Sequence, residues 1–77
     1  MDYEGWYKKA LASLRTLSSG DTFETKDLFK GTDWDKLTNG EKRGFGRYFS
    51  SKVKDGAIEN VIKIGEGKTH HNRYKKR

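Results

Sequence analysis

Apolar and polar positions alternate most regularly between residues 38 and 56, where the chain reads TNGEKRGFGRYFSSKVKDG. At about 100° per residue in a helix, Phe45, Phe49 and Val53 fall on one face. This spacing is typical of an amphipathic helix that packs its apolar face on a core.

Both ends of this segment carry helix-boundary signals. Thr38 precedes Glu41 by three positions, which is the spacing of a capping box. Gly56 stands where a left-handed C-terminal cap is favoured. The sequence therefore predicts a helix over residues 39–55.

The first twenty residues repeat apolar positions at intervals of three and four, which predicts an N-terminal helix ending between Ser18 and Gly20. These positions are Tyr3, Trp6, Tyr7, Ala10, Leu11, Leu14 and Leu17. We assign Trp6 to the core rather than to a platform for stacked bases, because aromatic residues in step with leucines are typical of packing.

Residues 21–37 predict shorter elements. Phe23, between polar and β-branched neighbours, favours a short strand. Thr25 is expected to cap a brief helix, KDLFK, that Gly31 closes. The next segment is expected to be a turn that Trp34 anchors on the core, with room for one further helical turn around that residue.

After Gly56 the composition favours strands. Ile58, Val61, Ile62 and Ile64 supply the β-branched content of the first strand, and GEGK predicts a turn. The segment THHNRYKKR is expected to return as a second strand containing Tyr74. Its last three residues, KKR, are expected to be frayed.

The predicted order is helix, short strand, short helix, turn, long helix and β-hairpin, which is the α+β arrangement of a winged helix-turn-helix. With 77 residues the chain has room for one domain. Its expected parts are an N-terminal helix over 1–20, a helix-turn-helix core over 21–56, a hairpin wing over 57–74 and a basic tail over 75–77. The connection between the short and long helices is longer than the usual turn of three or four residues.

Several segments together resemble a small uncharacterised family of bacterial and phage proteins with a winged-helix appearance. The resemblance lies in FETKDLF (23–29), GFGRYF (44–49) and GAI (56–58), with Trp34, Leu37, Val53 and Tyr74. It spans residues 21–74 and implies a winged-helix fold and a phage or prophage context. It implies no particular biochemical activity.

Charge is distributed unevenly along the chain. Residues 1–40 carry six lysines or arginines against seven acids, whereas residues 41–77 carry eleven against four, within a formal net charge of +6. The basic half begins with the amphipathic helix. Such asymmetry favours a polyanionic partner whose binding depends strongly on salt.

The polar face of the predicted long helix has the residue types that contact nucleic acid. Arginines one turn apart suit phosphate oxygens or the acceptor edge of guanine, and the small residue Gly44 allows close approach. The exposed amides of Asn39 and Gly40 at the helix start suit a phosphate. The candidate nucleic-acid contacts, on the helix and on the wing, are Lys42, Arg43, Arg47, Ser50, Ser51, Lys54, Lys63, Lys68 and Arg73.

The sequence leaves two hypotheses about function. In the first, the protein binds double-stranded DNA through the helix at 39–55, as a phage or prophage transcriptional regulator or accessory factor. In the second, its basic face docks on an acidic host protein. Because an extra helix or heptad segment for a large interface is lacking, we expect a monomer or a weak homodimer, with Tyr3, Trp6 and Tyr7 as the candidate dimer patch.

Catalysis, metal binding and a membrane span find no support in the sequence. There is no cysteine, and Asp33 and Asp35 lie in a predicted turn without a nearby histidine. His70 and His71 are adjacent, so in a strand they would point to opposite faces. We therefore expect a cytoplasmic, non-enzymatic protein without metal or cofactor.

Overall fold

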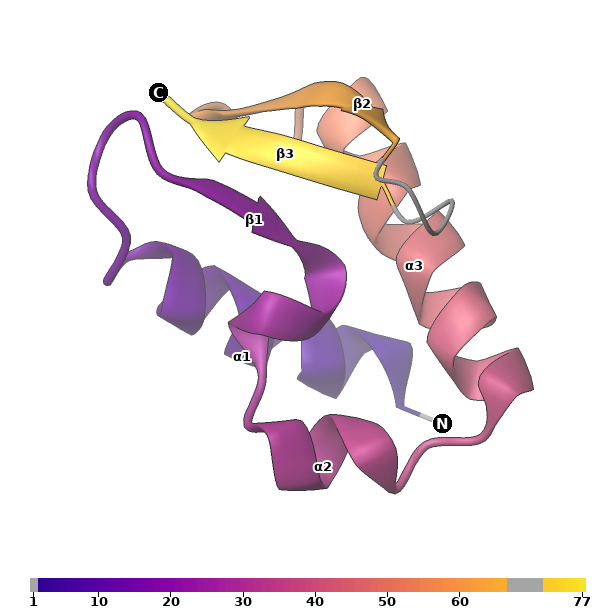
Figure 1. Ribbon diagram of the computed structural model, residues 1–77. Helices are drawn as coiled ribbons and strands as arrows, with labels where there is room; N and C mark the ends of the chain where they lie inside the picture. Colours follow the sequence, from indigo (N-terminus) through magenta and orange to yellow (C-terminus); the bar gives the residue numbers. More distant parts are fainter. Residues whose placement is uncertain (1, 67–71) are drawn as a thin grey trace.

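The structure, a computed structural model, describes residues 2–66 and 72–77 (Figure 1). Within these residues the chain is of the α+β class, with three α-helices and a three-stranded antiparallel sheet. In chain order the elements are helix α1 (Tyr3–Leu14), strand β1 (Thr22–Glu24), 3-10 helix η1 (Thr25–Leu28), helix α2 (Gly31–Asp35), helix α3 (Asn39–Lys54), strand β2 (Val61–Glu66) and strand β3 (Asn72–Lys76).

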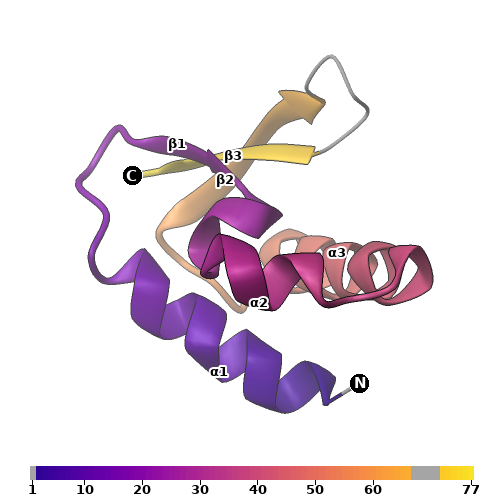
Figure 2. The same ribbon diagram turned by 60° about the horizontal axis from the view of Figure 1, so that its bottom comes forward.

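The sheet has the strand order β1-β3-β2, so the C-terminal strand lies between the other two. Tyr74 of β3 pairs with Phe23 on one side and with Lys63 on the other. The register between β2 and β3 shifts between Lys63 and Gly65, and Gly65 has a φ of 133° that favours glycine. The helices lie on one side of the sheet (Figures 1 and 2), and we call the other side its outer face.

The core fills the space between the sheet and the helices. Phe45 of α3 lies at its centre, where its ring centroid is within 6.5 Å of those of six other aromatic residues. The buried residues are Ala10, Leu14, Phe23, Leu28, Phe45, Phe49, Ile58, Val61 and Tyr74. The apolar faces predicted for the first and long helices are therefore confirmed, and so is the structural role of Trp6, which packs on Phe45 and Phe29.

The predicted ends of α3 are confirmed in detail. The Thr38 hydroxyl accepts a hydrogen bond from the Glu41 amide at 3.1 Å, and the Glu41 carboxylate accepts one from the Thr38 amide at 2.9 Å. Gly56, with a φ of 78°, follows the C-terminal end. The helix stops at Lys54, one residue before the predicted end.

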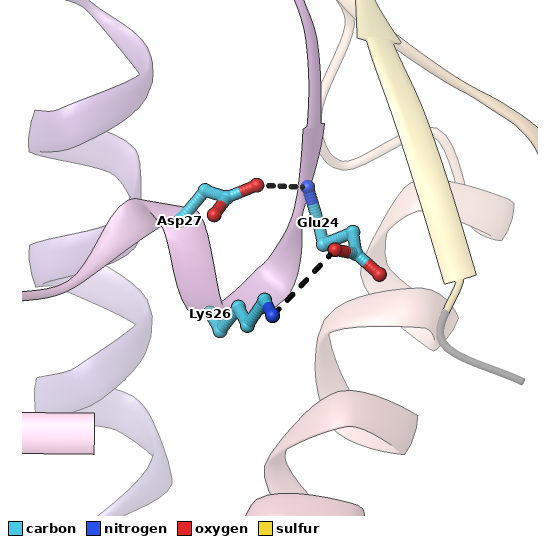
Figure 3. A network of polar contacts seen from close by, with 3 residues as sticks. All are labelled: Glu24, Lys26 and Asp27. Carbon is cyan, nitrogen blue, oxygen red and sulfur yellow. Dashed lines mark hydrogen bonds and ion pairs between the residues drawn. The ribbon is translucent and has the colours of Figure 1, made fainter. Parts of the chain in front are cut away.

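The short helix predicted over KDLFK is wrong in its boundaries. Thr25 begins the 3-10 helix η1, and Glu24 caps it. The Asp27 carboxylate accepts a hydrogen bond from the Glu24 amide at 2.9 Å, and Lys26 lies 3.9 Å from the Glu24 carboxylate (Figure 3). The helical segment ends because Phe29 is extended, with φ −130° and ψ 159°.

Gly31 begins helix α2 instead of closing the helix before it. Trp34 therefore lies in a helix and not in a turn, and α2 is the further helical turn expected around it. The Trp34 ring is half-buried and stacks on Phe29, with centroids 5.6 Å apart. Its predicted role as an anchor on the core is confirmed.

The prediction of a frayed basic tail is wrong. Lys76 belongs to β3: its amide donates to Asp21 O at 2.9 Å, and its carbonyl accepts from the Gly20 amide at 2.6 Å. The next residue, Arg77, donates its amide to Asn60 O at 2.8 Å. The tail is ordered because backbone hydrogen bonds hold it on both sides.

The prediction that the first helix ends between Ser18 and Gly20 is also wrong, since α1 ends at Leu14. The Lys76 ammonium donates to Leu14 O at 2.5 Å and to Leu17 O at 2.7 Å. A side chain from the sheet thus satisfies carbonyls at the end of α1 and in the turn that follows.

Candidate nucleic-acid interface

The face of α3 that points away from the core carries basic and small polar side chains. Arg43, Arg47, Ser51 and Lys54 are exposed, and Ser50 is half-buried at the edge of this face. We call these five residues the basic face of α3. Within residues 2–66 and 72–77 the one ion pair joins Lys26 to Glu24, so the cations of the basic face are not neutralised by acids of the described chain.

Lys42 does not belong to this face. It precedes the buried Phe49 by seven residues, or about two turns, so it lies on the core-facing side of α3 and is half-buried. The structure therefore separates Lys42 from the arginines with which the sequence grouped it.

Aromatic side chains fill the flank of α3 that faces α1. Tyr3 stacks on Tyr48 with centroids 5.4 Å apart, and Tyr7 meets Tyr48 edge-on at 5.7 Å. The Lys52 ammonium lies over both rings, 5.7 Å from the centroid of Tyr7 and 5.3 Å from that of Tyr48. The residues proposed as a dimer patch thus pack against α3 of their own chain.

This packing corrects the role expected for Gly44. A Cβ atom at Gly44 would collide with the Tyr3 hydroxyl, so the space above this glycine is already occupied within the chain. Lys52 was not among the predicted site residues, although its position one turn after Tyr48 could have indicated the contact. The position of Tyr3 had no local signal, because more than forty residues separate it from Tyr48.

The two described candidates on the hairpin lie on opposite faces of the sheet. Lys63 pairs with Tyr74 and therefore shares the face that packs on the helices, although its own side chain is exposed. Arg73 is the neighbour of Tyr74 along β3, so it lies on the outer face, opposite Glu24 in the register. Lys68, His70 and His71 lie outside the described residues.

The start of α3 is less suited to a phosphate than the sequence suggested. The Glu41 carboxylate already lies at this end and binds the Thr38 amide. That hydrogen bond holds the pKa of Glu41 below its ordinary value, so the carboxylate stays anionic at neutral pH. A negative charge beside Asn39 and Gly40 opposes the approach of a phosphate.

The described residues lack two other kinds of feature. In residues 2–66 and 72–77, no group of three or more histidine, aspartate or glutamate side chains is arranged to hold a metal ion. In the same part of the chain, no helix combines the length and the apolar character needed to cross a membrane.

Comparison with known proteins gives a structural neighbour and a family. A solved structure described as "SCCmec type IV LP1413 - nucleic acids binding protein" superposes with a TM-score of 0.70 at 21% sequence identity, covering 96% of this chain and 85% of that chain. At this identity the likeness shows a shared fold. No curated protein matches the sequence significantly. A family model described as a domain of unknown function, DUF1413, matches residues 8–76, and the chain therefore belongs to this uncharacterised family, in agreement with the resemblance found in its sequence.

Proposed function

We propose that the protein is a non-enzymatic nucleic-acid-binding protein that contacts double-stranded DNA through the basic face of α3. The observation that carries this proposal is the face itself: Arg43, Arg47 and Lys54 are exposed on one side of a helix that is anchored by Phe45 and Phe49 on the other. A rigid helix holds its exposed side chains in a fixed arrangement, which is what recognition of a regular polyanion requires.

The chemistry of these side chains fits phosphate and base edges. Arg43 and Arg47 lie one turn apart, and each planar guanidinium can donate two parallel hydrogen bonds to a phosphate or to the acceptor edge of guanine. Ser51 and Lys54 extend the face along the helix and suit further phosphate oxygens. The excess of positive charge after residue 40 adds attraction that does not depend on base sequence.

The arrangement of elements supports a winged helix-turn-helix mode of docking. In that mode α2 and α3 form the helix-turn-helix, α3 enters the major groove, and the β2–β3 hairpin lies against the backbone. The structural neighbour, whose overall fold resembles that of this chain, is described as a nucleic acids binding protein. We propose that the protein acts in this way as a transcriptional regulator or accessory factor in a phage or prophage.

The proposal is tested by titrating a labelled duplex of mixed sequence at about 50 mM and 200 mM salt, because several phosphate contacts cost orders of magnitude in affinity over this range. We expect tight binding at the lower salt and a steep loss at the higher. The double variant R43A/R47A should bind at least about 10-fold more weakly with an unchanged melting temperature.

The control is K8A/R15A, which removes the same charge from Lys8 of α1 and from Arg15 just after it, both exposed, and should bind nearly as well as the wild type. Single-stranded DNA and RNA of the same sequence, titrated in parallel, identify the preferred nucleic acid. Absence of binding to any of them at the lower salt would overturn the proposal. An acidic protein partner, sought by pull-down, would then be the explanation for the basic face.

A further inference from the structure

We infer that nucleic acid reaches α3 from the side of the β2–β3 hairpin, passing close to the helix backbone at Gly46, and that Lys63 is the contact from β2. This inference rests on the proposed function and specifies the orientation of the same interface. It is carried by the two glycines of α3, by the packing of α1, and by the register of the hairpin.

Among the residues that the structure describes, none packs where a side chain at Gly46 would lie. A glycine inside a helix costs stability relative to alanine, because its backbone loses more freedom on folding. A Cβ atom at Gly46 would meet nothing of the described chain within 4 Å, so alanine would fit there without strain. At Gly44, two residues earlier, the Tyr3 hydroxyl leaves no room for a Cβ atom. The space at Gly44 is thus occupied by the Tyr3 side chain, whereas the space at Gly46 is open among the described residues.

The open space lies on a definite side of α3. Gly46 is three residues after Arg43 and four residues before Ser50, so it borders the basic face. Tyr48, which carries the contacts to α1, points to nearly the opposite side of the helix. Figure 2 shows α1 on one side of α3 and the hairpin rising on the other. Approach from α1 is obstructed by Tyr3, whereas on the other side the half-buried Gly46 leaves space for at least a methyl group.

The hairpin places a single described candidate cation on this side. Lys63 is exposed and pairs with Tyr74, whose ring contacts Phe49 of α3 with centroids 5.2 Å apart. Lys63 therefore lies on the sheet face that looks toward α3. Arg73 lies on the outer face of the sheet, which is turned away from α3. A phosphate backbone that runs over Gly46 would have Arg43 on one side and Lys63 on the other.

The first test is G46A, which should change stability and affinity in opposite directions. Its melting temperature should rise by about 5 °C, because alanine favours the helix. Its affinity for the labelled nucleic acid should fall about 10-fold, because the added methyl group keeps the ligand from the backbone. The matched control is G44A, whose methyl group displaces the exposed Tyr3 ring on the α1 side and should leave affinity within about 2-fold of the wild type.

The second test compares K63Q with R73Q, which remove equal charge from opposite faces of the sheet. K63Q should lower the slope of log K against log salt concentration by about one unit, which corresponds to one lost phosphate contact. R73Q should leave this slope unchanged.

The inference is overturned if G46A and K63Q bind like the wild type while R43A/R47A loses binding, a result that leaves the proposed function in place. It is also overturned if G46A lowers the melting temperature, because Gly46 would then have a structural role. Failure of the wild type to bind any nucleic acid would remove the proposed function itself.

Discussion

Replacing Lys76 by methionine tests how the end of the chain stabilises the fold. Lys76 lies in β3, and its ammonium donates to Leu14 O and Leu17 O, at the end of α1 and in the following turn. Helix α1 has no basic residue in its own last turn, and the Lys76 ammonium adds positive charge at the negative end of the helix, beyond that of the C-cap residue Arg15. Methionine keeps the length and the apolar stem of the side chain but removes the donor.

The expected cost follows from these two contacts. A hydrogen bond that involves a charged group contributes about 1.5–3 kcal/mol net. Two such bonds give about 3–6 kcal/mol, against which stands the ordering of a flexible side chain at up to about 2 kcal/mol. We therefore expect K76M to lower the free energy of unfolding by about 2 kcal/mol, which corresponds to about 10 °C in melting temperature for a domain of this size.

The measurement is thermal and urea unfolding followed by circular dichroism, with K75M as the control. Lys75 is the neighbouring residue of β3, is exposed on the outer face, and makes no side-chain hydrogen bond within the described chain. Both variants remove one positive charge, so any relief of charge repulsion is common to the two. K75M should unfold within about 0.5 kcal/mol of the wild type. Equal stability of K76M and K75M would refute the capping role of Lys76.

Two further predictions concern the core and the start of α3. The Tyr74 hydroxyl is fully buried and has no hydrogen-bond partner among the described residues. Y74F should therefore raise the free energy of unfolding, measured by urea titration, by about 1 kcal/mol. A loss of stability would show that the hydroxyl has a partner. The folded-state pKa of Glu41 lies below its ordinary value of 4.5, so its stabilising effect is complete above that pH and is lost as the pH falls through the lowered value. The melting temperature should consequently fall more steeply with acid for the wild type than for E41Q, and parallel curves would contradict the role of this carboxylate.

Local signals predicted the long helix almost to the residue. The capping box of Thr38 and Glu41 and the left-handed Gly56 act within four positions of the helix ends, so the local sequence is sufficient to predict where the helix begins and ends. The short elements between Phe23 and Trp34 were less predictable. Gly31 suits the end of one helix and the start of another equally well. In the structure it begins α2, and Phe29 packs between Trp6 and Trp34.

The candidate site divides in the same way. Helical spacing alone placed Arg43, Arg47 and Lys54 on one exposed face. The half-buried position of Lys42 follows from the same spacing, yet a count of basic residues had grouped it with the arginines. The opposite orientations of Lys63 and Arg73 required the register of β2 against β3, which includes a shift at Gly65.

The sequence by itself determined the amphipathic helix, its caps, the basic second half of the chain and membership of an uncharacterised family. These properties depend on residue types and on neighbours within one or two helical turns. Only the tertiary structure decided that Tyr3 covers Gly44 and that Lys76 caps α1. These contacts join residues about forty to sixty positions apart, and their geometry is fixed by packing and strand register, which no local pattern of residues encodes.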